Sequence, residues 1–198
     1  MAPSQGPAPS LRRVGGDGVL SVRIRSRRPD DVPLLAQVLL AQQPLTRYPF
    51  RNALPFPVER FMHAHDARDA WTAEVAGRPV GQVCRVGPPH SYPEAQAMNE
   101  ACAREHGCAV DDLGWVATLF VDAGARALGL GRALLDAAVA GIREAGLRPC
   151  LEVLPVHAAA LAMYVSSGWR EAIRVRPEWL RAAAGDDVPD VRVLVLPG

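Results

Sequence analysis

The chain has 198 residues, of which 49% are hydrophobic and 22% charged, and its net charge is +1. This composition suits one globular domain with a sizeable core. The balanced charge excludes a strong electrostatic attraction of the whole protein to nucleic acid or to an anionic membrane. The cysteines lack the paired spacing of a zinc site, so reduced thiols in a cytoplasmic protein are the expectation. They are Cys84, Cys102, Cys108 and Cys150.

The N-terminus is rich in Pro, Gly and Ser and lacks the apolar stretch of a signal peptide. We therefore predict a disordered tail over residues 1–18, followed by one domain over residues 19–198. No stretch approaches the ~20 apolar residues that a membrane helix requires. The expectation is a soluble, cytoplasmic protein without a membrane partner.

The first part of the domain reads as a strand, a helix and an irregular segment. Residues 20–24 alternate between apolar and polar, which favours a half-buried strand. Asp30 or Asp31 is then expected to cap a helix. Residues 43–57 hold four prolines with aromatic residues between them, so this segment either forms part of a substrate wall or only fastens a loop to the core. The apolar stripe of the helix is Val32, Leu35, Val38 and Leu39.

A short helix near residues 58–62 is followed by a predicted hairpin, with strands over 70–75 and 80–86 and a turn at Gly77. The stretch His63-Ala64-His65-Asp66 contains metal-ligating side chains, but residues two apart on a helix point away from each other. We therefore predict no metal site. A further helix is predicted over 94–106, with Ala95, Met98 and Cys102 on one face.

Residues 115–121 are apolar and rich in β-branched and aromatic residues, which predicts a buried strand. The glycines of the following turn, Gly129 and Gly131, stand at the N-terminus of a predicted helix that ends near Gly146. Free N–H groups and the helix dipole favour an anion there, so the turn is a candidate phosphate cradle. The helix stripe is Leu134, Leu135, Ala138, Val139 and Ile142.

Two better-known phosphate cradles do not fit this turn. A Walker loop needs a lysine, and all 22 basic residues of this chain are arginine. The dinucleotide fingerprint needs a third glycine where this chain has Leu134.

The remainder is predicted as a strand over 150–154, a helix over 158–164 that ends near Gly168, a strand over 172–175, a helical or turn segment over 177–184, and a strand over 188–196.

Three of these features, taken in order, resemble the GNAT superfamily of acyl-CoA-dependent N-acyltransferases over residues 20–196. They are the turn Arg126-x-x-Gly129-x-Gly131 after a strand, the strand Leu151-Glu152-Val153, and Tyr164 followed by Gly168-Trp169. The resemblance implies an α/β fold with a mixed central sheet of about seven strands flanked by helices. The fourth and fifth strands of that sheet would splay around acyl-CoA.

The resemblance also implies how acetyl-CoA, as co-substrate, would be held. Its pyrophosphate would lie against the N–H groups from Leu128 to Arg132, and its pantetheine arm along the strand near Leu119, whose N–H would polarise the thioester carbonyl. His157 stands where the family usually has an asparagine, and Ala123 and Ala127 replace a proline and a glycine. The implied cofactor-binding residues are Leu119, Phe120, Val121, Arg126, Ala127, Leu128, Gly129, Leu130, Gly131, Arg132, His157 and Ala160.

Tyr164 matches the family's general acid, which protonates the departing sulfur, although a tyrosine that merely closes a helix is the alternative. The glutamate that many members carry early in the fourth strand would fall near Trp115, so it is missing. Glu152 is expected as the catalytic base, as in the ribosomal-protein N-terminal acetyltransferase branch. It could equally be a structural carboxylate held by an arginine. Asp111, Asp112, Asp122 and Glu74 are alternative bases.

The resemblance therefore implies an enzyme that transfers an acetyl group from acetyl-CoA to a primary amine by direct attack in a ternary complex. The alternative is a non-catalytic acyl-CoA-binding or sensor module of the same fold. The identity of the acceptor is not predicted, because the segments 43–57 and 87–113 that would select it have the least interpretable sequence patterns. The helix in the second segment is either an insertion that borders the acceptor site or a surface helix. Homodimerisation is common in the family and stays open here.

Overall fold

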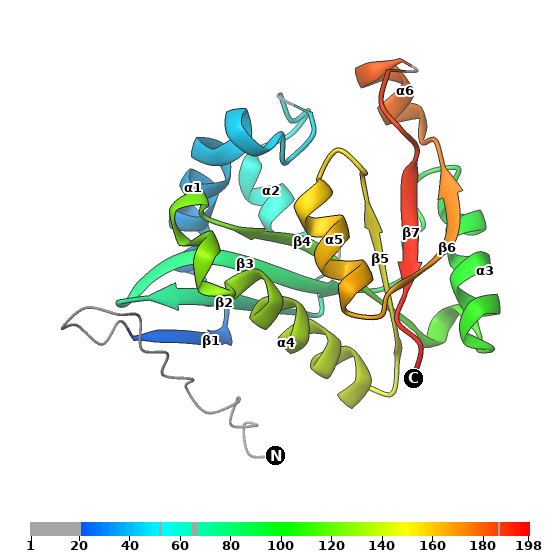
Figure 1. Cartoon of the computed structure of the whole chain (residues 1–198), viewed down its shortest axis with the longest axis horizontal. Helices are drawn as coiled ribbons and strands as arrows, with labels where there is room; N and C mark the ends of the chain where they lie inside the picture. Colours follow the sequence, from blue (N-terminus) through cyan, green and yellow to red (C-terminus); the bar gives the residue numbers. More distant parts are fainter. Residues whose placement is uncertain (1–20, 52, 65–66, 186) are drawn as a thin grey trace.

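Seven strands form one mixed sheet with helices on both faces (Figure 1), as the sequence predicts. The computed structural model describes residues 21–198 except 52, 65–66 and 186, so the predicted tail lies outside the described residues. The strands are β1 Val22–Ser26, β2 Asp69–Val75, β3 Arg78–Val86, β4 Leu113–Val121, β5 Arg148–Val153, β6 Arg170–Val175 and β7 Val191–Val195. The helices are α1 Asp31–Thr46, α2 Val58–Met62, α3 Ala95–His106, α4 Leu130–Glu144, α5 Ala158–Ser166 and α6 Glu178–Ala184, with short 3-10 helices η1 Val110–Asp112 and η2 Ala123–Leu128.

The strand order is β1-β2-β3-β4-β5-β7-β6. All neighbouring strands are antiparallel except β4 and β5, which are parallel and joined through α4. The last strand, β7, enters the sheet between β5 and β6. This order places β5 in the interior of the sheet, between β4 and β7.

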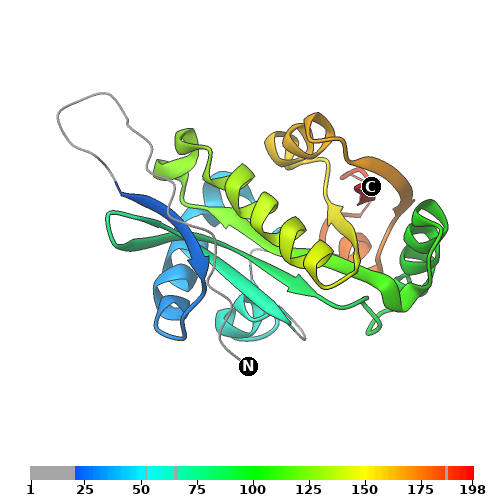
Figure 2. The same cartoon turned by 90° about the horizontal axis from the view of Figure 1, so that it is seen from below.

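The two faces of the sheet bury different clusters. The predicted stripe of α4 packs with Val116, Leu151, Val153 and Tyr164 on one face. On the opposite face, α1 and α2 pack around Phe120, while α3 packs with β6 and β7 around Trp115 and Cys150. Figure 2 shows α4 and α5 on one side of the sheet and α1 and α2 on the other. The face opposite α4 is therefore covered by two separate groups of helices.

Three details differ from the sequence prediction. Helix α1 continues to Thr46 and includes Pro44, so the irregular segment begins later than residue 43. A proline in the last turn removes one backbone hydrogen bond shortly before the helix ends, and the helix closes at Arg47, whose φ is 55°. Asp30 makes no side-chain cap. β7 begins at Val191, although Val188 is buried beside it.

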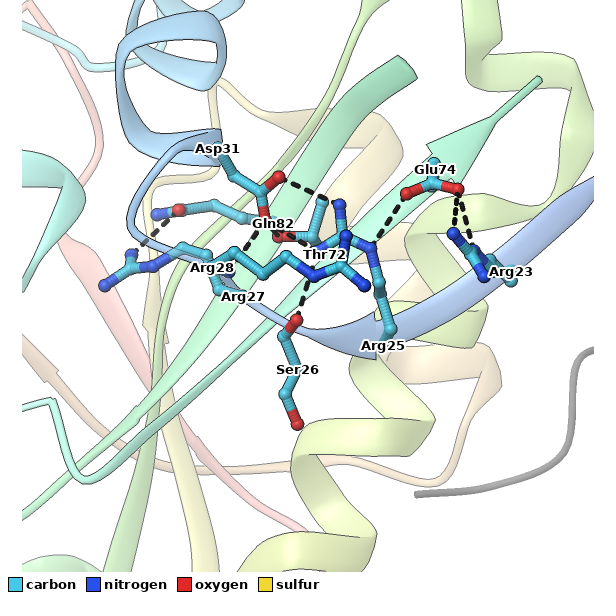
Figure 3. Close-up of polar contacts among 9 residues, drawn as sticks. All are labelled: Arg23, Arg25, Ser26, Arg27, Arg28, Asp31, Thr72, Glu74 and Gln82. Carbon is cyan, nitrogen blue, oxygen red and sulfur yellow. Dashed lines mark hydrogen bonds and ion pairs between the residues drawn. The ribbon is translucent and has the colours of Figure 1, made fainter. Parts of the chain in front are cut away.

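An arginine–carboxylate network ties β1 to β2 and to the start of α1 (Figure 3). Arg25 contacts Asp31 at 2.6 Å and Glu74 at 2.8 Å, and Arg23 contacts Glu74 at 2.7 Å. Burial opposes ionisation of both carboxylates, but hydrogen bonds from the arginines outweigh it, so the pKa of each lies below its ordinary value. Glu74, one of the alternative bases, is thus engaged in holding the fold together.

Candidate active site

The sheet is open between the second halves of β4 and β5, as the predicted splay requires. Four residue pairs, Leu113–Val116 with Arg148–Leu151, hold the parallel strands together. Beyond Val116, β4 continues for five residues without a partner on β5, whereas β5 stays paired with β7 through Val153. The edge of β4 from Ala117 to Val121 therefore has no strand along it on the side of β5. We call this opening the seam.

A bulge in β4 lies at the seam. Cys84 pairs with Ala117 and Gln82 with Phe120, so two residues of β4 oppose one residue of β3. Thr118 has a φ of 48°, a left-handed conformation that is strained for a β-branched residue. The extra residue changes which side chains face α4: Val116 and Leu119, three positions apart, both pack on the α4 cluster.

A buried glutamine holds the bulge. The Gln82 amide donates to the Thr118 hydroxyl at 3.1 Å and to the Met62 carbonyl at 3.1 Å, and its oxygen accepts from Arg27 at 3.0 Å. Gln82 is fully buried, and its contacts connect α2, β3, β4 and the end of β1. The sequence analysis did not predict the bulge; a single glutamine within the apolar run of β3 is the signal that points to it.

The predicted phosphate cradle connects β4 to α4. Asp122 accepts a hydrogen bond from the Gly124 N–H at 2.7 Å and caps η2, and Gly129 adopts the left-handed conformation, with a φ of 72°, at the cap of α4. At Gly131 an added Cβ would meet only the Met163 sulfur, at 3.7 Å. An added Cβ would thus make only an ordinary van der Waals contact there, and the unpaired N–H groups of the first turn of α4 can take an anion.

The two arginines of the cradle have partners within the protein. Arg126 donates to the Gln42 side chain of α1 at 3.3 Å. Arg132 donates to the Met163 carbonyl at 3.5 Å and to the Ser166 hydroxyl at 3.3 Å, both at the end of α5. The structure thus directs Arg126 towards α1 and Arg132 towards α5.

Tyr164 projects from α5 on the α4 side of the sheet. Its side chain is buried and packs edge-to-face on Trp169, with ring centroids 6.1 Å apart. Burial raises the pKa of its hydroxyl above the ordinary value, so the group is protonated at neutral pH. The hydroxyl makes no hydrogen bond with any residue that the structure describes.

Glu152 lies on the opposite face of the sheet, between the cluster of α1 and α2 and the cluster of α3. Solvent reaches its side chain, yet the surrounding protein removes enough water to raise its pKa to about 7. Among the described residues, no arginine forms an ion pair with Glu152. The alternative of a structural carboxylate held by an arginine is therefore not seen there.

All three tyrosines of the chain gather at this point. Burial, together with the charges of Tyr164 and Glu152, raises the pKa of Tyr48; burial and the charge of Glu152 do the same for Tyr92. Tyr48 packs with α1 and α2, whereas Tyr164 packs with α4, so the two tyrosines lie on opposite faces of the sheet. Tyr48 belongs to the segment 43–57 that is predicted as a possible substrate wall, and Tyr92 to the segment 87–113 that would help to select the acceptor, although Tyr92 itself is not predicted as a site residue.

His157 lies at the start of α5 and joins this group. Its ring packs edge-to-face on Tyr48, with centroids 5.5 Å apart, and Tyr48 also packs on Phe61 at 5.9 Å. Burial lowers the pKa of His157. The structure thus places His157 against the segment that follows α1, while Ala160 packs on the α4 cluster.

The alternative carboxylates occupy other places. Asp112 accepts from the Ala109 N–H at 3.1 Å, and Asp111 lies beside it in η1, before the start of β4. Asp122 caps η2. Across the described residues, no group of three or more His, Cys, Asp or Glu side chains could hold a metal ion, and no helix is long and apolar enough to cross a membrane.

Comparisons with known proteins agree with this geometry. The model of the acetyltransferase (GNAT) family matches residues 38–169, which include the seam, the cradle, Glu152 and Tyr164. No curated protein matches the chain in sequence.

Several solved structures share the fold at low sequence identity. The ribosomal-protein-S18-alanine N-acetyltransferase of Escherichia coli is 21% identical with a TM-score of 0.58, over 88% of this chain and 92% of that chain. The ribosomal-protein-alanine N-acetyltransferase of Brucella melitensis is 18% identical with a TM-score of 0.62, over 87% and 97%. The yncA protein of Salmonella typhimurium, solved with its cofactor acetyl-CoA, is 14% identical with a TM-score of 0.63, over 88% and 92%.

We predict that Gln82→Met lowers the free energy of unfolding by about 2 kcal/mol, because the Thr118 hydroxyl loses its donor and the Arg27 guanidinium loses one of its acceptors. Urea unfolding measures the change. Gln96→Met is the matched control: its amide, exposed on α3, contacts only Glu100 at 2.8 Å, and its loss should cost less than about 0.5 kcal/mol. Equal losses for the two variants would show that the glutamine does not hold the bulge.

Proposed function

The chain belongs to the acetyltransferase (GNAT) family, and on this premise we propose that it transfers the acetyl group of acetyl-CoA to a primary amine by direct attack in a ternary complex. One observation carries the proposal: Glu152 and Tyr164 lie on opposite faces of the sheet at the seam, where the pairing of β5 with β4 has ended. A proton acceptor and a proton donor therefore flank the same opening.

The seam and the cradle together suit an acyl-CoA co-substrate. The N–H groups from Leu128 to Arg132 would bind its pyrophosphate, and the free edge of β4 from Leu119 to Val121 would pair with the amides of its pantetheine arm. A β4 N–H near Leu119 would stabilise the charge that develops on the thioester oxygen. The left-handed Gly129 at the N-terminus of α4 supports this placement.

Glu152 supplies the base. An α-amino group with a pKa of about 7.7–8.0 costs about 1 kcal/mol to deprotonate at pH 7, and a lysine amine costs about 4.6. A carboxylate with a pKa of about 7 is matched to removing that proton near neutral pH. Glu152 takes the proton from the amine as the nitrogen attacks the carbonyl carbon.

Tyr164 supplies the acid. The carbon–sulfur bond breaks as the amide forms, and the electron pair leaves with the sulfur. The Tyr164 hydroxyl, which has no partner among the described residues, donates its proton to that sulfur and regains one from solvent.

The proposal is tested by thiol release from acetyl-CoA with a panel of primary amines, beside calorimetric titration of acetyl-CoA alone. We expect binding without an acceptor and thiol release that depends on an amine. Tight binding with no release for any amine would favour a non-catalytic sensor module instead. Absence of binding would contradict the phosphate cradle.

Tyr164→Phe should lower kcat by about 100-fold or more, because the sulfur then leaves without a proton donor. The Kd for acetyl-CoA, measured by calorimetry, should stay within about twofold, since the phenyl ring keeps its packing on Trp169. An unchanged kcat would remove the assignment of Tyr164 as the acid.

With an acceptor whose amine is neutral across the pH range, kcat/KM should rise as pH increases through about 7 and then level, because only the ionised Glu152 accepts a proton. Glu152→Gln should abolish this rise and lower kcat/KM by about 100-fold or more. Asp112→Asn, the same change of charge before β4, serves as the control and should leave the profile in place. A profile unmoved in Glu152→Gln would assign the base to a water chain or another carboxylate.

A further inference from the structure

Two neighbouring aromatic rings, each covered by one arginine, join the segment after α1 to α6. The Arg47 guanidinium lies 5.0 Å from the centre of the Phe50 ring, Phe50 lies 6.4 Å from Trp179 of α6, and the Arg51 guanidinium lies 5.2 Å from the centre of the Trp179 ring. We call these four residues the arginine–aromatic ladder. It joins the segment after α1 to α6.

Neither guanidinium of the ladder has an anionic partner. Within the described part of the chain, Arg47 and Arg51 make no ion pair and no side-chain hydrogen bond, whereas several other arginines pair with carboxylates. An aromatic face holds a guanidinium in place without using its N–H groups. Those N–H groups stay available for two parallel hydrogen bonds to a carboxylate or phosphate.

The ladder borders the proposed acceptor side of the seam. Arg47 directly precedes Tyr48, whose ring packs on His157 at the start of α5 with centroids 5.5 Å apart. Phe50 packs against the same cluster as Tyr92. An anion bound by the ladder would therefore lie beside the group of side chains that surrounds Glu152.

Two carboxylates and a further arginine lie close to the α6 end of the ladder. Glu94, Glu178 and Arg181 line a separate hollow of about 400 Å³ between the segment before α3 and α6. A polyanion that extended from the ladder into this hollow would meet its two carboxylates.

We propose that the acceptor is a primary amine that also carries one anionic group, a carboxylate or a phosphate. Arg47 and Arg51 bind this group and direct the amine to Glu152. The inference rests on the proposed function and names the class of its acceptor.

The test compares amines in pairs of similar amine pKa: an ω-amino acid with its amide, and an aminoalkyl phosphate with the corresponding amino alcohol. We expect kcat/KM to favour an anionic member by about 10- to 100-fold, the value of a charge-assisted hydrogen-bonded contact. The pair that shows the preference identifies the anion as carboxylate or phosphate.

The double variant Arg47→Gln/Arg51→Gln should lose this preference through a higher KM for the anionic amine, with kcat/KM for the neutral amine unchanged. Arg60→Gln, which removes an arginine of α2 whose guanidinium lies 5.4 Å from the centre of the Phe56 ring, is the matched control and should keep the preference. An unchanged Kd for acetyl-CoA shows that each variant is folded.

Turnover of neutral and anionic amines at equal kcat/KM, in the wild type and the double variant alike, would overturn the inference and leave the proposed function standing. A preference that persists in the double variant would also overturn it. Absence of turnover with every amine, despite acetyl-CoA binding, would overturn the proposed function and this inference together.

Discussion

The early end of the pairing between β4 and β5 is the constraint on which the candidate site depends. Backbone N–H and C=O groups inside a sheet are costly to leave unpaired, so an opening in the middle of seven strands needs a cause and a compensation. Because β5 stays paired with β7 up to Val153, the sheet stays closed on that side, and the opening lies between β4 beyond Val116 and β5 beyond Leu151. An extended ligand with amide groups along β4 would satisfy the groups that the missing strand leaves.

The bulge makes the free edge of β4 a defined surface. Thr118 would relax to an extended conformation if nothing opposed it, because its left-handed backbone is strained. The Gln82 amide bonds to its hydroxyl, and Arg27 and the end of α2 hold that amide in turn. The strain at the bulge is thus balanced by a buried polar network, which positions the backbone N–H groups next to the seam. Site geometry and core stability here depend on the same contacts.

Much of the fold could be predicted from local patterns, because apolar periodicity reports which face of an element is buried. Apolar periodicity predicts the buried face of α4 and the buried face of β7, which carries Val191, Val193 and Val195. The glycine turn with its flanking strands indicates the family. The bulge at Thr118, the entry of β7 beside β5 and the convergence of Tyr48 and Tyr92 on Glu152 could not be predicted this way. Each depends on contacts between distant segments, and a single sequence carries no period or spacing for such contacts.

The residues proposed to hold acyl-CoA and the residues proposed to surround the acceptor belong to different parts of the fold. The cradle and the free edge of β4 belong to the β4–α4 unit, whose core is buried by the α4 stripe. The side chains around Glu152 come from the segment after α1 and the segment before α3, which pack on two different clusters. These segments pack on clusters other than that of the cradle, and they meet the predicted cofactor-binding residues where Tyr48 packs on His157. In the proposed reaction, the acceptor would be selected by parts of the chain that contribute little to the core behind the cradle.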